Sequence, residues 1–330
     1  MFVSIGLRFR VEVEALNMAE AVGNYTRHRT APIMIVERGD DGRVRGYKVT
    51  MAPAVSGQSI AFGYMSALVS LAPKYDLAVC NNCKDYQKIG GFFKRADEID
   101  KGHDDRVKDC VVEDLTGFMS TLERQGQERG RMLRRTSPVM FSYLVPDSTS
   151  ARGVVVPQFH VRYNLLNPEQ QAPYQIEAGT AIYVHGVAVD VERIGRLEDG
   201  SYVENREKRI ELAFDALKAL YGGVIFGAKK ARYLPVFEPL GGIAAVSHPL
   251  PFSVTPPRFT DYVQENIARA EAFKISNVNL FCFDREGITS CGKNGKVVAS
   301  TSLEDLIEKV KTQVLNDLKA GKNEAGPGKA

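Results

Sequence analysis

The sequence has little of several features that would place it in a familiar class. None of its apolar runs approaches the roughly 18–20 residues that a membrane-spanning helix needs. Its five cysteines are an odd number and thinly spread, which argues against a secreted disulfide scaffold. The first residues alternate charged with apolar side chains, unlike a signal peptide. We therefore expect a cytoplasmic protein with no membrane partner.

Signatures of catalysis are also missing. The sequence has no zinc-protease helix motif, no nucleophile elbow and no dinucleotide fingerprint, and its five histidines are scattered. Residues 287–293 match most of a phosphate-binding loop, but Asn294 stands where the loop needs a hydroxyl and Gly295 interrupts the helix that should follow. We interpret this segment as a β-turn and the chain as a protein that is not an enzyme.

What the chain does contain is ample core material and local clusters of positive charge. Hydrophobic residues make up 44% of the 330 residues and charged residues 25%, as in a soluble globular protein. The net charge is only 43 − 40 = +3. Residues 124–135 nevertheless carry five arginines and one glutamate, and smaller clusters lie at 27–29 and 229–232. Such clusters suggest a localised anionic ligand, although each alone is also typical of ordinary solvated surface.

The hydrophobic pattern predicts an α+β fold. Residues 3–13 alternate apolar and polar side chains, which predicts a strand with one buried face and one open, charged face. Helical spacing follows Ser56, again in 203–221, and again after Ser302. Strands are expected at 139–145 paired with 154–163, then at 181–191 and 278–283. This order is that of the ferredoxin-like arrangement of RNA-recognition domains, which leave one sheet face open for nucleic acid.

We expect one domain spanning residues 1–330. Its core comprises residues 1–73 and 137–319, and residues 74–136 form a helical or irregular insertion. Residues 17–32 are polar, contain Gly23 and end at a proline, so they are expected to be a loop. A disordered tail is expected from about residue 320.

Several segments carry residues that suit an RNA backbone. In the strand 158–163, we expect Phe159, Val161 and Tyr163 to face the core and His160 and Arg162 to share the open face. The loop 23–29 offers Asn24, a tyrosine and the cations Arg27 and Arg29, which suit a phosphate with a stacked base. Arg134 and Arg135 precede two hydroxyl residues, and 226–232 could clamp a backbone. A plain polar surface remains the alternative for each segment.

Four residues of the insertion could hold a structural zinc ion. Cys80 and Cys83 form a C-x-x-C pair, and His103 and Cys110 follow downstream. Together they could supply four tetrahedral ligands, although the later spacing is not a standard one. The alternative is a set of free thiols, and no cofactor is required for folding.

Taken together, these segments resemble the DevR-type backbone subunit of archaeal type I-A CRISPR Cascade complexes, within the RAMP superfamily. The resemblance is carried by LNMAEAVGNYTRHRTAP, VSGQSIAFGY, GFM followed by RRTS, QFHVR and KKARYLP, all in one order. It implies a modified RNA-recognition-motif palm with finger- and thumb-like projections. It also implies a subunit that stacks with copies of itself along the spacer of a CRISPR RNA, together with other Cascade subunits, and presents the guide for pairing with target DNA without cutting the RNA.

The resemblance also implies a set of RNA-binding positions. With Arg27 of the 27–29 cluster added, the positions are Asn17, Asn24, Arg27, His28, Arg29, Ser56, Gln58, Arg134, Arg135, His160, Arg162, Lys229, Lys230 and Arg232. The chain departs from the family pattern at Gln58, where an acid is common, and at Ala231, where a serine is common. The remaining alternative is an endoribonuclease of the same superfamily with His160 and His28 as acid and base.

Overall fold

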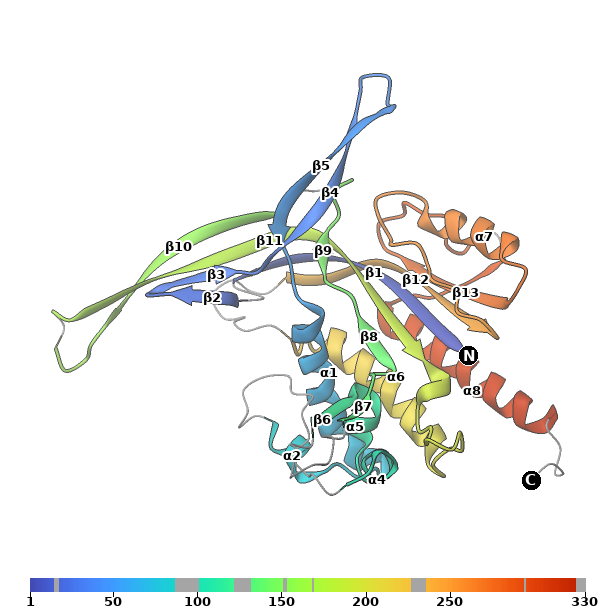
Figure 1. Ribbon diagram of the computed structural model, residues 1–330. Helices are drawn as coiled ribbons and strands as arrows, with labels where there is room; N and C mark the ends of the chain where they lie inside the picture. The colour runs from blue at the N-terminus through green and yellow to red at the C-terminus, as the bar shows by residue number, and fades with distance from the viewer. Residues whose placement is uncertain are drawn as a thin grey trace.

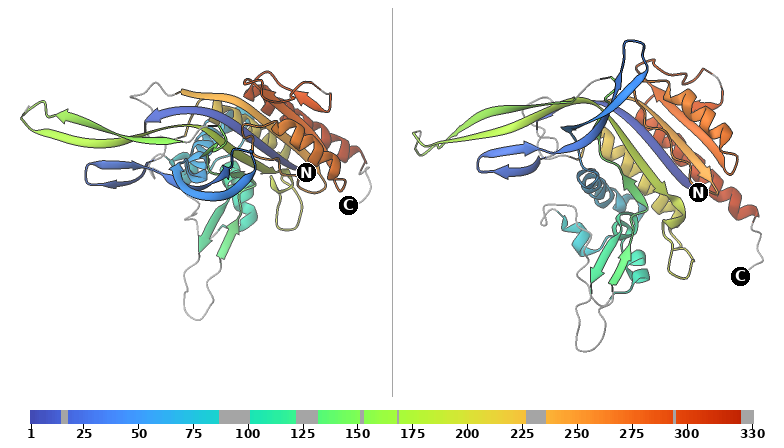
Figure 2. Two further views of the ribbon diagram at one scale, coloured as in Figure 1. Left: turned by 90° about the horizontal axis from the view of Figure 1, so that it is seen from above. Right: turned by 45° about the horizontal axis from the view of Figure 1, so that its top comes forward.

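The protein is built on one large β-sheet from which an arm and a hairpin project (Figure 1). The computed structural model describes residues 1–14, 18–86, 101–121, 132–150, 153–167, 169–226, 236–293 and 295–324. Two further views show that the arm, the hairpin and the insertion leave the sheet in different directions (Figure 2). The chain therefore has a compact centre with three projections.

The centre of the sheet is antiparallel. Its middle strand, β1 (Phe2–Glu14), pairs on one side with β11 (Gln171–Asp190) and on the other with β12 (Val236–His248). β13 (Asn277–Asp284) extends the sheet beyond β12, and the short β14 (Val297–Ala299) adds a parallel edge. The far edge of β11 pairs with β8 (Val139–Phe141) and β9 (Val145–Pro146).

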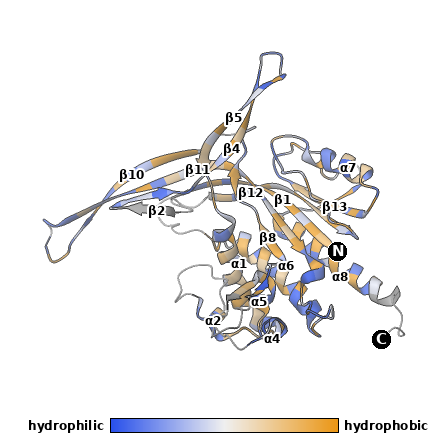
Figure 3. Ribbon diagram, in the orientation of Figure 1, coloured by the Kyte–Doolittle hydropathy of each residue, from blue (hydrophilic) through white to orange (hydrophobic). Residues whose placement is uncertain are grey.

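Three helices cover one face of this sheet. They are α1 (Gly57–Leu71), α6 (Arg206–Gly222) and α8 (Leu303–Glu324). Apolar residues of β1 such as Ile5, Leu7 and Phe9 are buried against them, together with Leu68 and Phe214 from the helices. The hydropathy colouring shows the same central strands and α1 as mostly hydrophobic (Figure 3). The predicted buried face of the first strand, the Ser56 start of α1 and the strand at 278–283 are confirmed.

The opposite face of the sheet is also covered, which the sequence did not predict. α7 (Tyr262–Ala272) packs there against β12 and β13 through a second core that includes Ile243, Cys282 and Ile267. The Arg8 side chain, expected on an open face, is 1% exposed and pairs with Asp147 and Glu286. The expectation of a charged open face is therefore wrong for the first half of β1. The cause is a covering layer contributed by distant loops.

The arm is formed by the outer half of β11 with β10 (Val154–Tyr163), β2 (Met18–Val22) and β3 (Tyr25–His28). A separate hairpin of β4 (Thr30–Arg38) and β5 (Val44–Pro53) rises beside it.

The prediction of a loop over 17–32 is wrong, because the segment contributes strands to both projections. Gly23 takes a positive φ of 58° at the β2–β3 turn. The strands at 139–145 and 154–163 do not pair with each other; both pair with β11.

The insertion contributes short helices and a small ribbon. Its elements, after the 3-10 turn Ala72–Tyr75, are α2 (Asn81–Lys84), α4 (His103–Asp109), α5 (Val111–Thr116), β6 (Phe118–Thr121) and β7 (Met132–Arg135). The predicted helix at 203–221 matches α6, which begins at Arg206. A separate 3-10 turn at Val191–Arg193 follows β11. α8 runs through Glu324, past the point where a tail was expected.

One disulfide joins two of the five cysteines. Cys282 on β13 is bonded to Cys291 in the loop that follows. Only the other three, Cys80, Cys83 and Cys110, are free thiols. The disulfide fastens the loop after β13 to the second core, outside the insertion.

Candidate nucleic-acid interface

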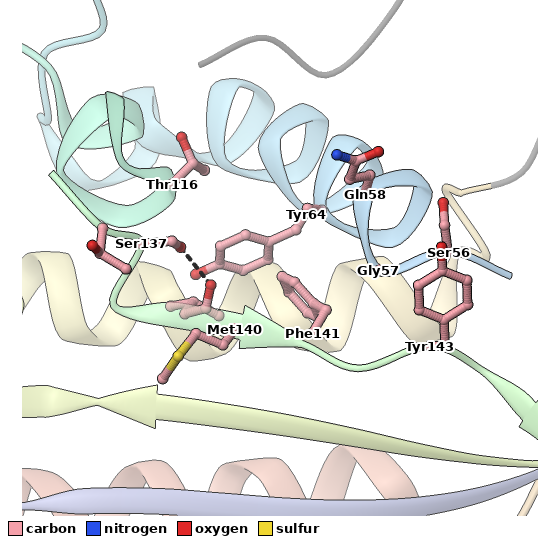
Figure 4. A pocket seen from close by; sticks show the side chains of 12 residues that line it. Ser56, Gly57, Gln58, Tyr64, Thr116, Ser137, Met140, Phe141 and Tyr143 are labelled. Carbon is pink, nitrogen blue, oxygen red and sulfur yellow. Dashed lines mark hydrogen bonds between the residues drawn. The ribbon is translucent and has the colours of Figure 1, made fainter. Parts of the chain in front are cut away.

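A cleft of about 670 Å³ opens between the start of α1 and the chain that leads into β8 (Figure 4). Its wall combines hydroxyl and amide groups with aromatic and thioether side chains. The lining residues are Ser56, Gly57, Gln58, Ala61, Tyr64, Thr116, Thr136, Ser137, Val139, Met140, Phe141 and Tyr143. We call it the α1 cleft.

The beginning of α1 is fixed by a side-chain cap and by a close backbone contact. Ser56 Oγ accepts a hydrogen bond from Ser59 N at 3.2 Å, which is the usual arrangement of an N-cap serine. Gly57 sits so close to β8 that a Cβ there would lie 2.5 Å from Phe141 O. The first turn of α1 holds no acidic residue, so the positive end of the helix dipole at the cleft is not neutralised from within the helix. Such a helix end favours a phosphate.

Some of the remaining side chains of the cleft form hydrogen bonds within the protein, and others are exposed to solvent. Tyr64 is buried, and its hydroxyl donates to Ala213 O. Ser137 donates to Val139 O. Met140 and Tyr143, in contrast, are 39% and 43% exposed. An exposed aromatic ring next to a helix N-terminus provides a surface on which a base can stack.

Arg134 and Arg135 occupy opposite environments. Arg134 lies on the outer face of β7, is exposed, and has no hydrogen-bond partner among the described residues. Arg135 is 6% exposed, and its guanidinium donates to Asp114 and to the backbone carbonyls of Arg193 and Arg196. Burial lowers the pKa of Arg135, and the Asp114 carboxylate opposes that effect. The structure thus assigns Arg135 to the interior, because its donors are already used there.

The turn at 27–29 comes close to the beginning of α1. Ala54 N donates to Arg29 O at 2.9 Å, only two residues before the Ser56 cap. Arg29 is partly buried and its Nε has no hydrogen-bond partner within the described residues. Asn24 and Arg27, which precede Arg29 in the chain, are exposed. Two of the sequence motifs therefore meet at one place.

His28, in the same turn, is held in the interior. Its backbone N donates to Glu177 Oε2 at 2.6 Å, and its Nδ1 lies 2.8 Å from Arg29 O. Its Nε2 would lie 3.2 Å from a Cβ placed on Gly179. Burial lowers the pKa of the His28 imidazole, so the ring is neutral at pH 7. His28 therefore fixes the turn against β11 rather than offering a positive charge.

A second hollow, of about 570 Å³, lies beside the first. It shares Met140, Phe141 and Tyr143 with the α1 cleft and reaches the other face of the sheet near Ser142 and Arg258. The ribbon from β8 to β9 therefore has a hollow on each side. Arg258 is exposed at the outer rim and adds a cation that the sequence reasoning missed.

His160 and Arg162 lie on the arm, away from the α1 cleft. The register pairs His160 with Tyr174, and the guanidinium of Arg162 stands 5.2 Å from the centre of the Tyr174 ring. The expectation that Phe159 and Tyr163 face the core is wrong, since they are 63% and 65% exposed. The period of two is real, but the strand lies in a projection with no core beneath either face.

The structure thus brings together part of the expected RNA-binding set. Ser56 and Gln58 line the α1 cleft, Arg134 lies two residues before the lining residue Thr136, and the turn that carries Arg29 is hydrogen-bonded to Ala54 just before the Ser56 cap. Four expected positions lie outside the described residues: Asn17, Lys229, Lys230 and Arg232. Tyr143 and Met140 were missed because their segment, 139–145, was interpreted only as a strand, and nothing in the local sequence marks these two side chains as lining a cleft.

The expected set of four zinc ligands is not assembled as predicted. Cys80, Cys83 and Cys110 lie together, with their sulfur atoms within 4.8 Å of one another. His103 instead groups with Asp104 and Glu198, and its Nδ1 lies 2.9 Å from Asp104 Oδ1. The inclusion of His103 with the cysteines is therefore wrong. At the start of α4 its ring points toward Asp104 and Phe118.

Similarity to known proteins places this chain among CRISPR-associated proteins. Residues 5–267 match the family described as CRISPR-associated negative auto-regulator DevR/Csa2, and the chain belongs to that family. CRISPR-associated protein Cas7/Csa2 1 of Saccharolobus solfataricus is 32% identical over 277 residues, which span 78% of this chain and 82% of that protein. CRISPR-associated aCascade subunit Cas7/Csa2 2 of the same organism is 31% identical over 342 residues, spanning 94% and 100% of the two chains.

Solved structures support the fold at lower sequence identity. A chain of a CRISPR RNA-guided surveillance complex superposes with a TM-score of 0.51 at 12% identity, covering 95% of this chain and all of that one. A chain of such a complex in a pre-nicking state gives a TM-score of 0.53 at 11% identity, covering 95% and 99%. Within the described residues, no helix combines the length and apolar character needed to cross a bilayer.

Proposed function

We propose that this chain is a CRISPR RNA-binding backbone subunit of a Cascade-type interference complex. It binds the spacer RNA without regard to sequence, assembles with copies of itself and with other Cascade subunits, and presents the guide for pairing with target DNA. Membership of the DevR/Csa2 family supports this, as do a relative named as an aCascade subunit and structural neighbours in RNA-guided surveillance complexes. In such complexes base pairing reads the sequence, so the protein needs only to grip a backbone.

The core topology supports a palm related to the RNA-recognition motif. The strands β12, β1, β11 and β8 lie side by side in that order and are all antiparallel, with α1 and α6 on one face. This is the strand order of the split βαβ arrangement. Because α7 and neighbouring loops cover the other face near Arg8, the RNA is expected to run at the edge by β8 rather than across the central strands.

The observation that carries the proposal is the convergence at the α1 cleft. Within the α1 cleft, an uncompensated helix N-terminus and the exposed Tyr143 provide groups for a phosphate and a base. The exposed Arg134, two residues before the lining residue Thr136, provides a cation for a second phosphate. Backbone phosphates and stacked bases are the features that a sequence-independent RNA-binding protein contacts.

Binding of single-stranded RNA by charge variants tests the proposal. Arg134→Ala is expected to weaken binding about tenfold, equivalent to about 1.4 kcal/mol, for RNAs of unrelated sequence. It should also flatten the dependence of log K on log salt by about 0.7, because one phosphate contact is lost. Fluorescence anisotropy at several salt concentrations measures both quantities.

The matched control is Lys274→Ala. Lys274 is an exposed cation just past α7, on the opposite side of the sheet from the α1 cleft, and its removal should leave binding unchanged. Equal losses for the two variants would show nonspecific attraction to the whole surface and would contradict a defined interface. A loss confined to one RNA sequence would contradict backbone recognition.

The endoribonuclease alternative is disfavoured by the placement of its two histidines. His28 packs against Gly179 whereas His160 pairs with Tyr174, a separation of five residues or about 17 Å along β11. An acid and a base acting on one 2′-hydroxyl and its neighbouring phosphate must both be within hydrogen-bond reach. Incubation with precursor CRISPR RNA is expected to leave it intact; cleavage abolished by His160→Ala would establish the enzyme instead.

A further inference from the structure

We propose that Cys80, Cys83 and Cys110 form a binding site for one thiophilic metal ion, and that the ion is Zn²⁺. The site lies in the insertion and is separate from the α1 cleft. It would supply three thiolate ligands and leave the fourth position to a water molecule. The inference does not rest on the proposed function of the chain.

The three sulfur atoms have the spacing that a tetrahedral ion needs. All lie within 4.8 Å of one another. Around a zinc ion with Zn–S bonds of about 2.3 Å, tetrahedral ligands stand about 3.8 Å apart. Small rotations of the Cys side chains are therefore enough to close the site, and no backbone movement is needed.

Two separate backbone segments deliver the ligands. Cys80 precedes the single turn of α2 and Cys83 lies within it, whereas Cys110 precedes α5. A backbone hydrogen bond from Val111 N to Ala78 O, at 3.0 Å, holds the two segments side by side.

Exposure differs among the three cysteines in a way that suits an ion site. Cys83 and Cys110 are buried, whereas Cys80 is partly exposed. An ion can therefore enter past Cys80, and a water molecule can complete its coordination on that side. A soft thiolate set of this kind favours zinc over the hard cations magnesium and calcium.

The site would connect the end of α1 to a wall of the α1 cleft. Cys80 and Cys83 follow α1 and its 3-10 turn, and α5 carries Cys110 just before its first residue and Thr116, a cleft residue, at its last. A bound ion would therefore hold the position of α5 beside α1. We expect it to stabilise the fold, with no chemical step of its own.

Metal analysis of the full-length protein tests the inference. Protein expressed with zinc in the medium, purified without chelator and dialysed, should contain about one zinc per chain. Cys80→Ser is the main variant, because a partly exposed position tolerates serine; it should lose most of the bound zinc. Cys291→Ser is the control, since Cys291 is bonded to Cys282 and lies outside the cluster. Its zinc content should equal that of the wild type.

Spectroscopy of the wild-type protein keeps the test independent of variants that fail to fold. Cobalt added to chelator-treated protein should give sulfur-to-metal charge-transfer absorption and the visible bands of a tetrahedral ion, and zinc should abolish both. The chelator alone should lower the melting temperature. Metal-free protein with no cobalt spectrum would overturn the inference, as would a disulfide within the cluster found by mass spectrometry of the untreated protein.

Discussion

At the scale of single residues, Arg135 shows how a basic motif can serve the interior. Its guanidinium shares the Asp114 carboxylate with Arg209, and Gly195 N donates to the same carboxylate. Arg135→Ala should lower the free energy of unfolding by about 3–5 kcal/mol, because it leaves a buried carboxylate with one fewer partner and removes a donor from three backbone carbonyls. Urea unfolding followed by circular dichroism measures this loss.

The adjacent Arg134 is the control for that experiment. It is exposed, so Arg134→Ala should change stability by no more than about 0.5 kcal/mol while weakening RNA binding. If both variants destabilised the fold equally, the different roles assigned to these neighbours would be wrong.

His185 makes stability depend on acidity. It is buried between Ser142 and Tyr221, and burial lowers the pKa of its imidazole to about 4. In the unfolded chain the pKa is about 6.5, so between pH 6.5 and pH 4 the unfolded state binds the additional proton. The stabilising contribution is therefore complete above pH 6.5 and is lost as the pH falls, by up to about 3 kcal/mol.

Unfolding free energies measured at pH 7.5 and pH 5 test this contribution. His185→Gln keeps a hydrogen-bonding side chain but cannot take up a proton, so its stability should fall less than that of the wild type over this range. An identical fall in both proteins would assign the effect to other groups, His28 among them.

Residue types alone could not separate Arg134 from Arg135, or His28 from a surface histidine. The strand period does place neighbours on opposite faces, so one of two adjacent arginines in a strand had to point inward. Which one did so depended on Asp114, 21 residues away, and on carbonyls near 193–196. Contacts of that kind leave no local pattern in a single sequence.

At the scale of elements, the beginning of α1 depends on the absence of a side chain. A Cβ at Gly57 would meet Phe141 O at 2.5 Å, so Gly57→Ala should push α1 away from β8 and cost about 1–3 kcal/mol. The change should also alter the shape of the α1 cleft and weaken RNA binding. Thermal unfolding and RNA titration of the same preparation measure the two effects.

Gly46→Ala serves as the matched glycine control. Its added methyl group would meet only the tip of the Glu37 side chain, at 3.8 Å, and Gly46 lies in the β4–β5 hairpin. Stability should therefore stay within about 0.5 kcal/mol of the wild type. Equal effects at both glycines would show that the contact with Phe141 is unimportant.

Arg162 belongs to the arm and tests how far the RNA extends. It is exposed and stacks on Tyr174, which suits a backbone contact. Arg162→Ala should weaken binding of long RNA at every sequence and flatten its salt dependence, without changing stability. RNA too short to reach from the α1 cleft to the arm should bind both proteins equally, and a loss with such RNA would place Arg162 at the cleft itself.

Elements with a strong period and a clear cap were predictable, and isolated hairpins were not. β1, α1 and α8 each combine regular apolar spacing with a buried face, and Ser56 and Ser302 mark the two helix starts. β4 and β5 pair only with each other as a ladder, and few of their side chains are buried, so no core-facing stripe marks them in the sequence. α7 was missed because no element was predicted between residues 221 and 278.

At the scale of the whole molecule, the projections carry exposed apolar side chains. Leu165 and Leu166 at the tip of the arm are 98% and 96% exposed, and Tyr47 and Val49 of the β4–β5 hairpin are 65% and 63% exposed. Apolar groups displayed in this way are typical of surfaces that meet another protein. They accord with a subunit that stacks on its copies, where the contact is head to tail and does not close into a ring.

A double change at the arm tip tests this assembly role. Leu165→Ser with Leu166→Ser should leave the melting temperature of the isolated chain unchanged, because nothing is packed against these side chains. It should reduce the length of the particles formed on RNA, measured by sedimentation velocity and electron microscopy. Particles of unchanged length would exclude the tip from contacts between subunits.

The α+β class of the fold was predictable from the sequence, but the covering of the second face of the sheet by other elements was not. Alternation in β1 indicated a charged face, and solvent was the simplest environment for it. Asp147 and Glu286 provide a buried environment instead, from loops 139 and 278 residues away along the chain. The location of the nucleic-acid surface therefore depended on long-range pairing that the order of motifs alone could not supply.

A single strand, β11, serves both the core and the arm. From Gln171 to Asp190 it spans about 60 Å, one half packed beside β1 and the other extending outward with β10. Its right-handed twist consequently sets the angle between the arm and the core of the sheet. In an assembly joined through the tips, the helical rise and rotation per subunit would be inherited from the geometry of this one strand. A bend introduced midway along it would then change the pitch of the entire particle while leaving each protomer folded.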